Sequence, residues 1–168
     1  LGDAIRAAGL GYLLWFEPER VAPGSKIDRE RPEWVIKRGD GWRLFRFHDE
    51  AAREWMTEVI DSHIKTAQLT WVRWDFNMEP LEYWRQNDAP DRQGITEIRH
   101  LEGLYGMWAE LQRRHPGLII DNCSSGGRRL DIEAGRYGLP LWHSDLQCEG
   151  SHPEADQLQN GGLYRWVP

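Results

Sequence analysis

The chain has 168 residues and a formal charge of −6, enough length for one domain with a real core. It has no basic run, which argues against nucleic acid or an anionic membrane surface as a partner. No apolar stretch approaches the roughly 18 residues that cross a bilayer, and two cysteines are too few for a disulfide framework. No signal peptide is visible, but the opening LGDAIRAAG resembles a helix tail with natural residues before it, so this absence decides little about location. A cytoplasmic location is the expectation.

Short apolar runs alternate with helical patterns along the chain. In chain order, we expect a helix tail at 1–9, a strand at 9–18, a helix at 49–67, a strand at 69–77, a helix at 96–115, a strand at 117–125, a short helix at about 129–136, a strand at 138–145, a helix at 153–161 and the start of a strand at 163–168. The segment 49–67 carries an apolar stripe with helical spacing, and Asp49 or His48 is placed to cap it. Pro18 ends the first strand and Pro116 stops the second long helix.

Five strands with helices between them imply an α/β protein with a parallel sheet and right-handed crossovers. A doubly wound sheet and a (β/α)8 TIM barrel both have this alternation. The barrel is favoured because barrel enzymes build their sites at the C-terminal ends of several strands. Six polar residues fall at such ends: Glu17, Asp75, Asn77, Cys123, Ser144 and Asp145. A complete barrel takes about 250 residues, so residues 1–168 are expected to form part of one such catalytic domain.

The run TWVRWDFN, residues 70–77, places three polar side chains on one face of a strand and apolar side chains on the other. Its carboxylate, Asp75, and the carboxylate of Asp145 end two strands that are separated by one further strand. In a barrel they would face each other, as the two carboxylates of a glycoside hydrolase do. Arg73 is placed to keep Asp75 ionised. From spacing alone, catalysis and simple capping of the following helix are about equally open for these aspartates.

Five sequence blocks resemble those of the family 36 glycoside hydrolases, the bacterial α-galactosidases and their relatives. The blocks are LWFEPERV (14–21), RPEW (31–34), VRWDFN (72–77), DNCSSGGRRLD (121–131) and LWHSD (141–145). The resemblance runs in the right order over nearly the whole chain, and it implies a (β/α)8 catalytic domain with a retaining mechanism. It places Asp75 at the nucleophile and Asp145 at the acid/base.

The same resemblance assigns residues that bind the sugar. These are Trp15, Arg73, Asn77, Cys123, Gly126, Gly127 and Trp142. Three positions depart from the family pattern: Arg73 stands for a lysine, Arg128 for a third glycine, and Cys148 for a second aspartate. The alternatives are a structural tryptophan at 15 or 142 and an inert buried thiol at 123, while His143 is a candidate for the wall of the site.

The resemblance therefore implies hydrolysis of terminal α-galactosides, on α-linked galacto-oligosaccharides, through a covalent glycosyl-enzyme. It implies no cofactor, and the scattered histidines and aspartates lack the spacing of metal ligands. Within the family, the alternatives are an α-N-acetylgalactosaminidase or a galactosyl transferase. Outside it, the alternative is a non-catalytic sugar-binding barrel relic. We expect the 168-residue chain alone to be inactive, and the full-length protein to be a homo-oligomer.

Overall fold

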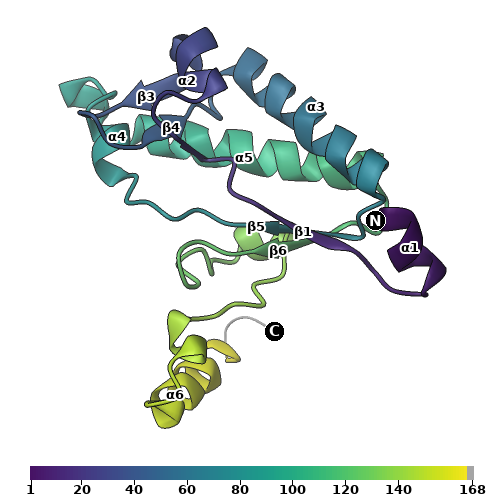
Figure 1. The fold of residues 1–168 in the computed structure, drawn as a ribbon. Helices are drawn as coiled ribbons and strands as arrows, with labels where there is room; N and C mark the ends of the chain where they lie inside the picture. Colours follow the sequence, from purple (N-terminus) through teal and green to yellow (C-terminus); the bar gives the residue numbers. More distant parts are fainter. Residues whose placement is uncertain (166–168) are drawn as a thin grey trace.

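The computed structural model describes residues 1–165, and its centre is a three-stranded parallel sheet (Figure 1). The strand order is β1 (Leu13–Phe16), β5 (Trp71–Trp74) and β6 (Ile119–Asn122). The long helices α3 (Glu50–Ala67) and α5 (Ile95–Arg114) connect these strands. The remaining elements are α1 (Gly2–Ala7), β2 (Arg20–Val21), α2 (Lys26–Glu30), β3 (Val35–Lys37), β4 (Arg43–Phe45), α4 (Leu81–Arg85) and α6 (Pro153–Leu163), with 3₁₀ turns at Pro32–Trp34, Pro90–Arg92, Ala134–Arg136 and Asp145–Cys148. An α/β fold with a parallel sheet is confirmed.

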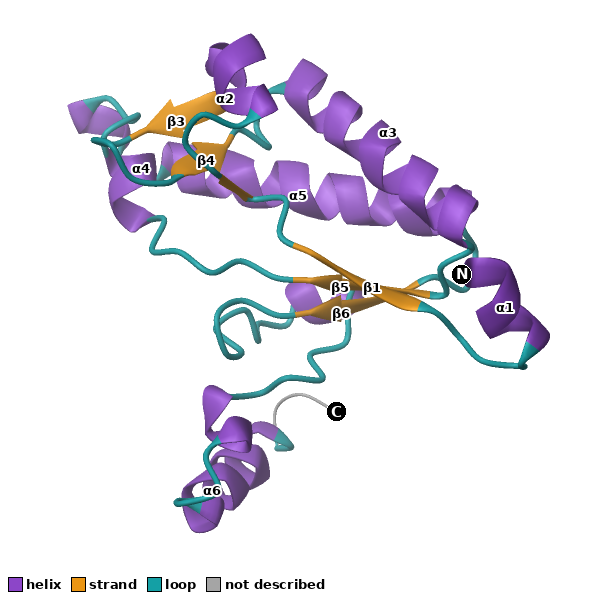
Figure 2. Cartoon of the chain, viewed as in Figure 1, coloured by secondary structure: helices purple, strands orange, loops and turns teal. Residues whose placement is uncertain are grey.

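Helices α3 and α5 lie together over one face of this sheet, and the chain leaves from the opposite side toward α6 (Figure 2). The covered face is dry, because Val72 and Trp74 of β5 are fully buried against Leu104 and Trp108 of α5. Helix α3 begins where expected, with Asp49 Oδ1 accepting a hydrogen bond from the Ala52 backbone N–H at 2.9 Å. Hydrophobic burial therefore fixes which way the strands face and leaves the other face of the sheet for polar groups.

The uncovered face of the sheet carries one row of residues in register across the three strands. Trp15 pairs with Arg73 on β5, and Arg73 pairs with Asp121 on β6. Since side chains alternate along a strand, these three point to the same side of the sheet. Trp15 keeps 52% of its surface exposed there. This row leads directly to Asp75, which follows β5.

A second, antiparallel sheet with the order β2-β4-β3 interrupts the alternation between β1 and α3. Sequence patterns did not predict it, because strands of two or three residues show no measurable period. Its centre is apolar, with Leu44 and Phe45 fully buried. This sheet covers the upper end of the α3–α5 layer in Figure 1.

Two expected elements are wrong at the C-terminal side of the chain. The strand expected at 138–145 is reduced to a single bridge, Leu139 to Asp121, and Pro140 follows it without a backbone N–H to continue the ladder. The helix expected at about 129–136 is only the 3₁₀ turn Ala134–Arg136. A further strand was expected to start at 163, but Leu163 is the last residue of α6. The end of that expected strand, residues 166–168, lies outside the described residues. No helix in the described part of the chain is long and apolar enough to span a membrane.

Candidate active site

Asp75 lies at the C-terminal end of β5 and accepts three hydrogen bonds. Trp15 Nε1 donates to Oδ2 at 3.2 Å, while the backbone N–H groups of Phe76 and Ser125 donate to Oδ1 at 2.8 and 3.2 Å. Burial acts to raise the pKa of Asp75, but the nearby Asn77 side chain, Trp15 and the two backbone groups lower it below the ordinary value. Asp75 is therefore held as a carboxylate, with one edge toward the exposed indole of Trp15.

Arg73 does not form the ion pair with Asp75 that the sequence suggested. Its Nη1 donates to Asp121 Oδ2 at 2.6 Å, and Asp121 Oδ1 also accepts the Leu141 backbone N–H at 3.1 Å. Burial acts to lower the pKa of Arg73, but Asp121 outweighs it and raises that pKa, with Asp75 contributing only at longer range. The hypothesis that Arg73 keeps Asp75 ionised is corrected: hydrogen bonds do so. The guanidinium lies 5.4 Å from the Trp142 ring centroid.

The loop after β6 has three successive residues with positive φ: Ser125, Gly126 and Gly127, at 46°, 79° and 85°. Left-handed backbone of this kind favours glycine and aims consecutive N–H groups into a concave nest. Ser125 reaches Asp75 from this loop. A Cβ on Gly126 would meet the carboxylate carbon of Asp145 at 2.7 Å, and one on Gly127 would meet the His143 carbonyl. The loop therefore requires glycine at both positions.

The same loop brings the two candidate carboxylates together. Asp75 contacts Ser125, and the Asp145 carboxylate packs on Gly126, the next residue. Asp145 opens a 3₁₀ turn that Ser144 caps, with Ser144 Oγ accepting the Leu146 N–H at 3.1 Å. The separation of the two carboxylates stays a prediction, but both contact consecutive residues of one short loop, Ser125 and Gly126.

Trp142 and Cys123 also lie at this loop. Trp142 Nε1 donates to Asp145 Oδ1 at 3.0 Å. The Cys123 thiol is buried, which raises its pKa, although the backbone N–H groups of Gly126 and Gly127 lower it in part. A neutral buried thiol is a weak hydrogen-bonding group rather than a nucleophile.

Asn77 is positioned through its backbone by groups that follow β1. Its N–H donates to Glu17 Oε1 at 2.6 Å, and its carbonyl accepts Arg20 Nη1 at 3.1 Å. Arg20 also pairs with Glu17 and lies 4.2 Å from the Trp42 ring centroid. Glu17 therefore holds the backbone around Asn77 in place.

Two of the departures from the family pattern lie at the margin of this arrangement. Arg128 turns away from the two carboxylates to pair with Glu79 and the Met78 carbonyl. Cys148 is exposed at the end of its 3₁₀ turn. Among residues 1–165, no group of three or more His, Cys, Asp or Glu side chains is placed to hold a metal ion.

The buried cluster around Glu19, which we call the Glu19 cluster, was not found from the sequence. Glu19 is fully buried and accepts Trp74 Nε1 at 3.0 Å, His100 Nε2 at 2.9 Å and Arg129 Nη2 at 2.7 Å. Burial acts to raise the pKa of Glu19, but the Arg129 charge and the bonds from His100 and Arg129 lower it. His100 is itself buried and contributes only its Nε2 to this cluster. The cluster ties the end of β1 and helix α5 to the far end of the Ser125–Gly127 loop.

The fold and this arrangement of carboxylates define the chain's class: it belongs to the melibiase family, whose family model matches residues 1–150. Among curated relatives, α-galactosidase AgaA of Geobacillus stearothermophilus is 30% identical over 86% of this chain. α-Galactosidase 2 of Pediococcus pentosaceus is 28% identical over 94% of it. The chain spans only about a fifth of the length of these relatives, 21% and 22%.

Solved structures agree with this membership. The crystal structure of the α-galactosidase from Lactobacillus brevis matches 97% of this chain and 22% of its own, with a TM-score of 0.82 at 25% identity. The AgaA structure matches 86% of this chain and 21% of its own, with a TM-score of 0.74 at 30% identity. AgaA variants have been solved in complex with stachyose and with raffinose.

Proposed function

We propose that the chain carries the two catalytic carboxylates of a retaining α-galactosidase, with Asp75 as nucleophile and Asp145 as acid/base. The observation that supports this most is their shared loop: Asp75 accepts the Ser125 N–H at 3.2 Å, and Asp145 packs on Gly126. One short segment thus sets the position of both groups. A separation of about 5–5.5 Å is expected, because a retaining mechanism needs both within reach of one anomeric carbon.

The chemistry follows from two different environments. In the first step, an Asp75 oxygen attacks the anomeric carbon while the glycosidic C–O bond breaks and Asp145 gives its proton to the leaving oxygen. In the second step, Asp145 takes a proton from water, the water oxygen attacks the same carbon, and the bond to Asp75 breaks. The hydrogen bonds that Asp75 accepts favour its ionised form, whereas Asp145 is exposed to solvent.

The substrate proposed is an α-linked galacto-oligosaccharide. Trp15 offers an exposed indole beside Asp75, and planar aromatic faces suit the apolar side of a sugar ring. The complexes of AgaA with stachyose and raffinose support this class. The parallel sheet is proposed to be part of a (β/α)8 barrel that includes residues 1–168. A cytoplasmic location and a homo-oligomeric state stay predictions.

The competing proposal is a sugar-binding relic without catalysis. The observation that favours it is the 2.6 Å ion pair between Arg73 and Asp121. Arg73 stands where the family pattern has a substrate-binding lysine, and this pair engages its guanidinium with Asp121 instead of with a sugar. A panel of nitrophenyl α- and β-glycosides, given to the full-length gene product, separates the two. Turnover of the α-galactoside alone supports the hydrolase, and turnover of none supports the relic.

The two aspartates are distinguished by azide rescue of their glycine variants on an activated α-galactoside. In Asp75→Gly, azide occupies the space of the nucleophile and attacks from the β face, so a β-galactosyl azide is expected. In Asp145→Gly, Asp75 still forms the β-linked glycosyl-enzyme, and azide attacks the opposite face to give an α-galactosyl azide. If each variant gave the azide of the opposite configuration, Asp145 would be the nucleophile and Asp75 the acid/base. A near-normal rate of Asp75→Gly without azide would make Asp75 structural.

A further inference from the structure

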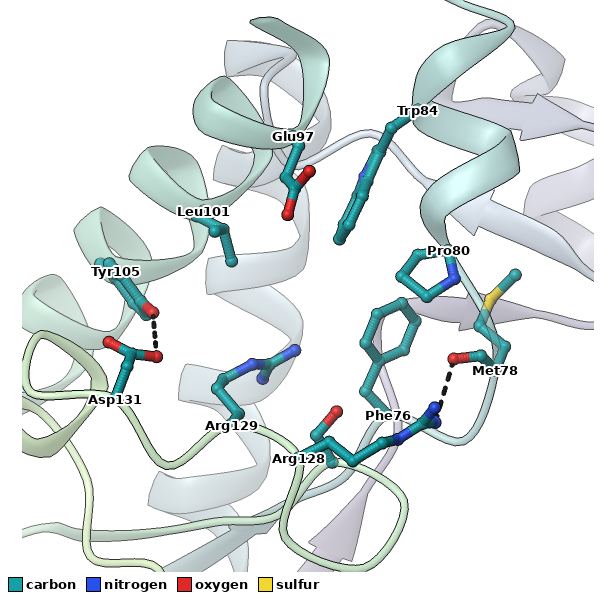
Figure 3. Close-up of a pocket in the computed structure, with 11 residues that line it drawn as sticks. Phe76, Met78, Pro80, Trp84, Glu97, Leu101, Tyr105, Arg128, Arg129 and Asp131 are labelled. Carbon is teal, nitrogen blue, oxygen red and sulfur yellow. Dashed lines mark hydrogen bonds between the residues drawn. The ribbon is translucent and has the colours of Figure 1, made fainter. Parts of the chain in front are cut away.

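A cavity of about 270 Å³ lies beside the candidate active site, on the helix-covered side of the sheet (Figure 3). It is open to solvent on one side and is bounded by the segment after β5, helix α5 and the loop after β6. Phe76, Trp84, Leu101 and Tyr105 form its apolar walls. None of the residues assigned to the catalytic chemistry lines it, so it is a separate feature of the molecule.

Two buried N–H donors at this cavity have no hydrogen-bond partner among residues 1–165. They are Arg129 Nη1 and Trp84 Nε1, on side chains of residues that are each 8% exposed. Figure 3 shows the Arg129 guanidinium extending into the space between Leu101 and Phe76. A buried donor left without a partner costs about 1–3 kcal/mol. A bound molecule that carries hydrogen-bond acceptors would remove this cost.

The charges around the cavity disfavour an anion. The positive charge of Arg129 is matched by Glu19, which is fully buried behind it at 2.7 Å. Arg128, at the rim, is paired with Glu79. Two further carboxylates line the cavity, that of Glu97 from α5 and that of Asp131 from the loop after β6, so an incoming anion would meet like charges. These carboxylates are instead acceptors for hydroxyl donors.

We propose that this cavity is a second saccharide site that takes one neutral pyranose ring. A sugar ring presents hydroxyl groups that both donate and accept, together with apolar C–H faces. The cavity offers all three complements: free N–H donors on Arg129 and Trp84, carboxylate acceptors, and aromatic walls. Ser124 at its floor precedes Ser125, which donates to Asp75. A bound ring thus contacts the loop that holds the candidate nucleophile.

The test is sugar binding to the full-length gene product and to cavity variants. Crystals are soaked in D-galactose and in D-glucose, and affinities are measured by calorimetry with an iminosugar saturating the candidate active site. Leu101→Trp fills the cavity and is expected to weaken the second binding event at least tenfold. Trp84→Phe keeps the ring but removes the N–H, so a loss of about 2- to 12-fold is expected, the equivalent of one net hydrogen bond.

Ile98→Trp is the matched control, because Ile98 lies on the same helix and is 54% exposed; it should bind as the parent does. Thermal unfolding identifies any variant that fails to fold, and Trp84→Phe then carries the test. Ring-shaped density on Arg129 together with the two losses supports the site. Density for waters alone, or affinities unchanged in both cavity variants, would overturn it. Inorganic sulfate bound there in preference to both sugars would overturn the neutral class.

Discussion

Replacing Glu19 by glutamine is expected to destabilise the fold strongly. The Glu19 carboxylate accepts from three side chains, Trp74, His100 and Arg129, at 2.7 to 3.0 Å, and none of its surface is exposed. Glutamine keeps one acceptor oxygen and turns an N–H₂ donor toward the remaining donors. The Arg129 guanidinium is then buried without a counter-charge.

The magnitude follows from the burial of the pair. Removing one partner of a buried ion pair typically costs about 3–5 kcal/mol, a large share of the roughly 5–15 kcal/mol that stabilises a domain. The measurement is urea unfolding of the full-length gene product at pH 7. Glu82→Gln is the control, since Glu82 and its partner Arg85 keep 53% and 57% of their side chains exposed; such a pair contributes about 0–1 kcal/mol.

The pH dependence of the free energy of unfolding tests the same role of Glu19. Because the pKa of Glu19 is lowered in the folded state, its contribution is complete above the ordinary value of 4.5 and is lost as pH falls through the lowered value. The parent should therefore lose stability on acidification more steeply than Glu19→Gln. A loss of less than about 1 kcal/mol in Glu19→Gln, or the same acid dependence in both proteins, would refute the role given to this cluster.

Three further outcomes are expected in the full-length gene product. Trp15→Phe removes one donor to Asp75, so the acid limb of the pH–rate profile should move to higher pH; an unmoved limb would mean that Trp15 does not hold the carboxylate. Gly126→Ala places a Cβ against the Asp145 carboxylate, the proposed acid/base, at a φ of 79°, so kcat should fall at least tenfold and the free energy of unfolding should fall by about 1–3 kcal/mol; parental kcat would contradict the packing. Under native conditions, Ellman's reagent should label Cys148 before Cys123, because Cys148 is exposed and burial raises the pKa of Cys123; equal rates would contradict this.

The long helices and the parallel strands could be predicted from sequence because each has a strong local pattern. Helix 49–67 was expected from its stripe and cap, and α3 covers Glu50–Ala67. The segment 138–145 has an apolar run but also Pro140, and one bridge is all that remains of its expected strand. The antiparallel β2-β4-β3 sheet could not be recognised in the sequence, since strands of two or three residues are specified by the residues that pack on them and are too short to show an alternating pattern.

The candidate site divides in the same way. Sequence blocks indicated Asp75, Asp145 and the glycine turn, and the structure brings all three to one loop. The predicted partner of Arg73, Asp75, was wrong, because the register of the sheet places Arg73 beside Asp121 on the next strand. Glu19 was missed, since its partner Arg129 lies 110 residues away and no local pattern connects them.

The different surroundings of the two carboxylates are what a retaining mechanism requires of a nucleophile and an acid/base. Asp75 is 8% exposed and surrounded by donors that favour its ionised form, so it is ready to attack without first losing a proton. Asp145 is exposed and accepts a hydrogen bond from Trp142 Nε1, so the proposed acid/base is open to solvent. Because both depend on consecutive residues of one loop, a change that moves the loop moves the pair together. We therefore expect the Glu19 cluster, which holds the far end of that loop through Arg129, to stabilise the separation of the two carboxylates on which the proposed retaining mechanism depends.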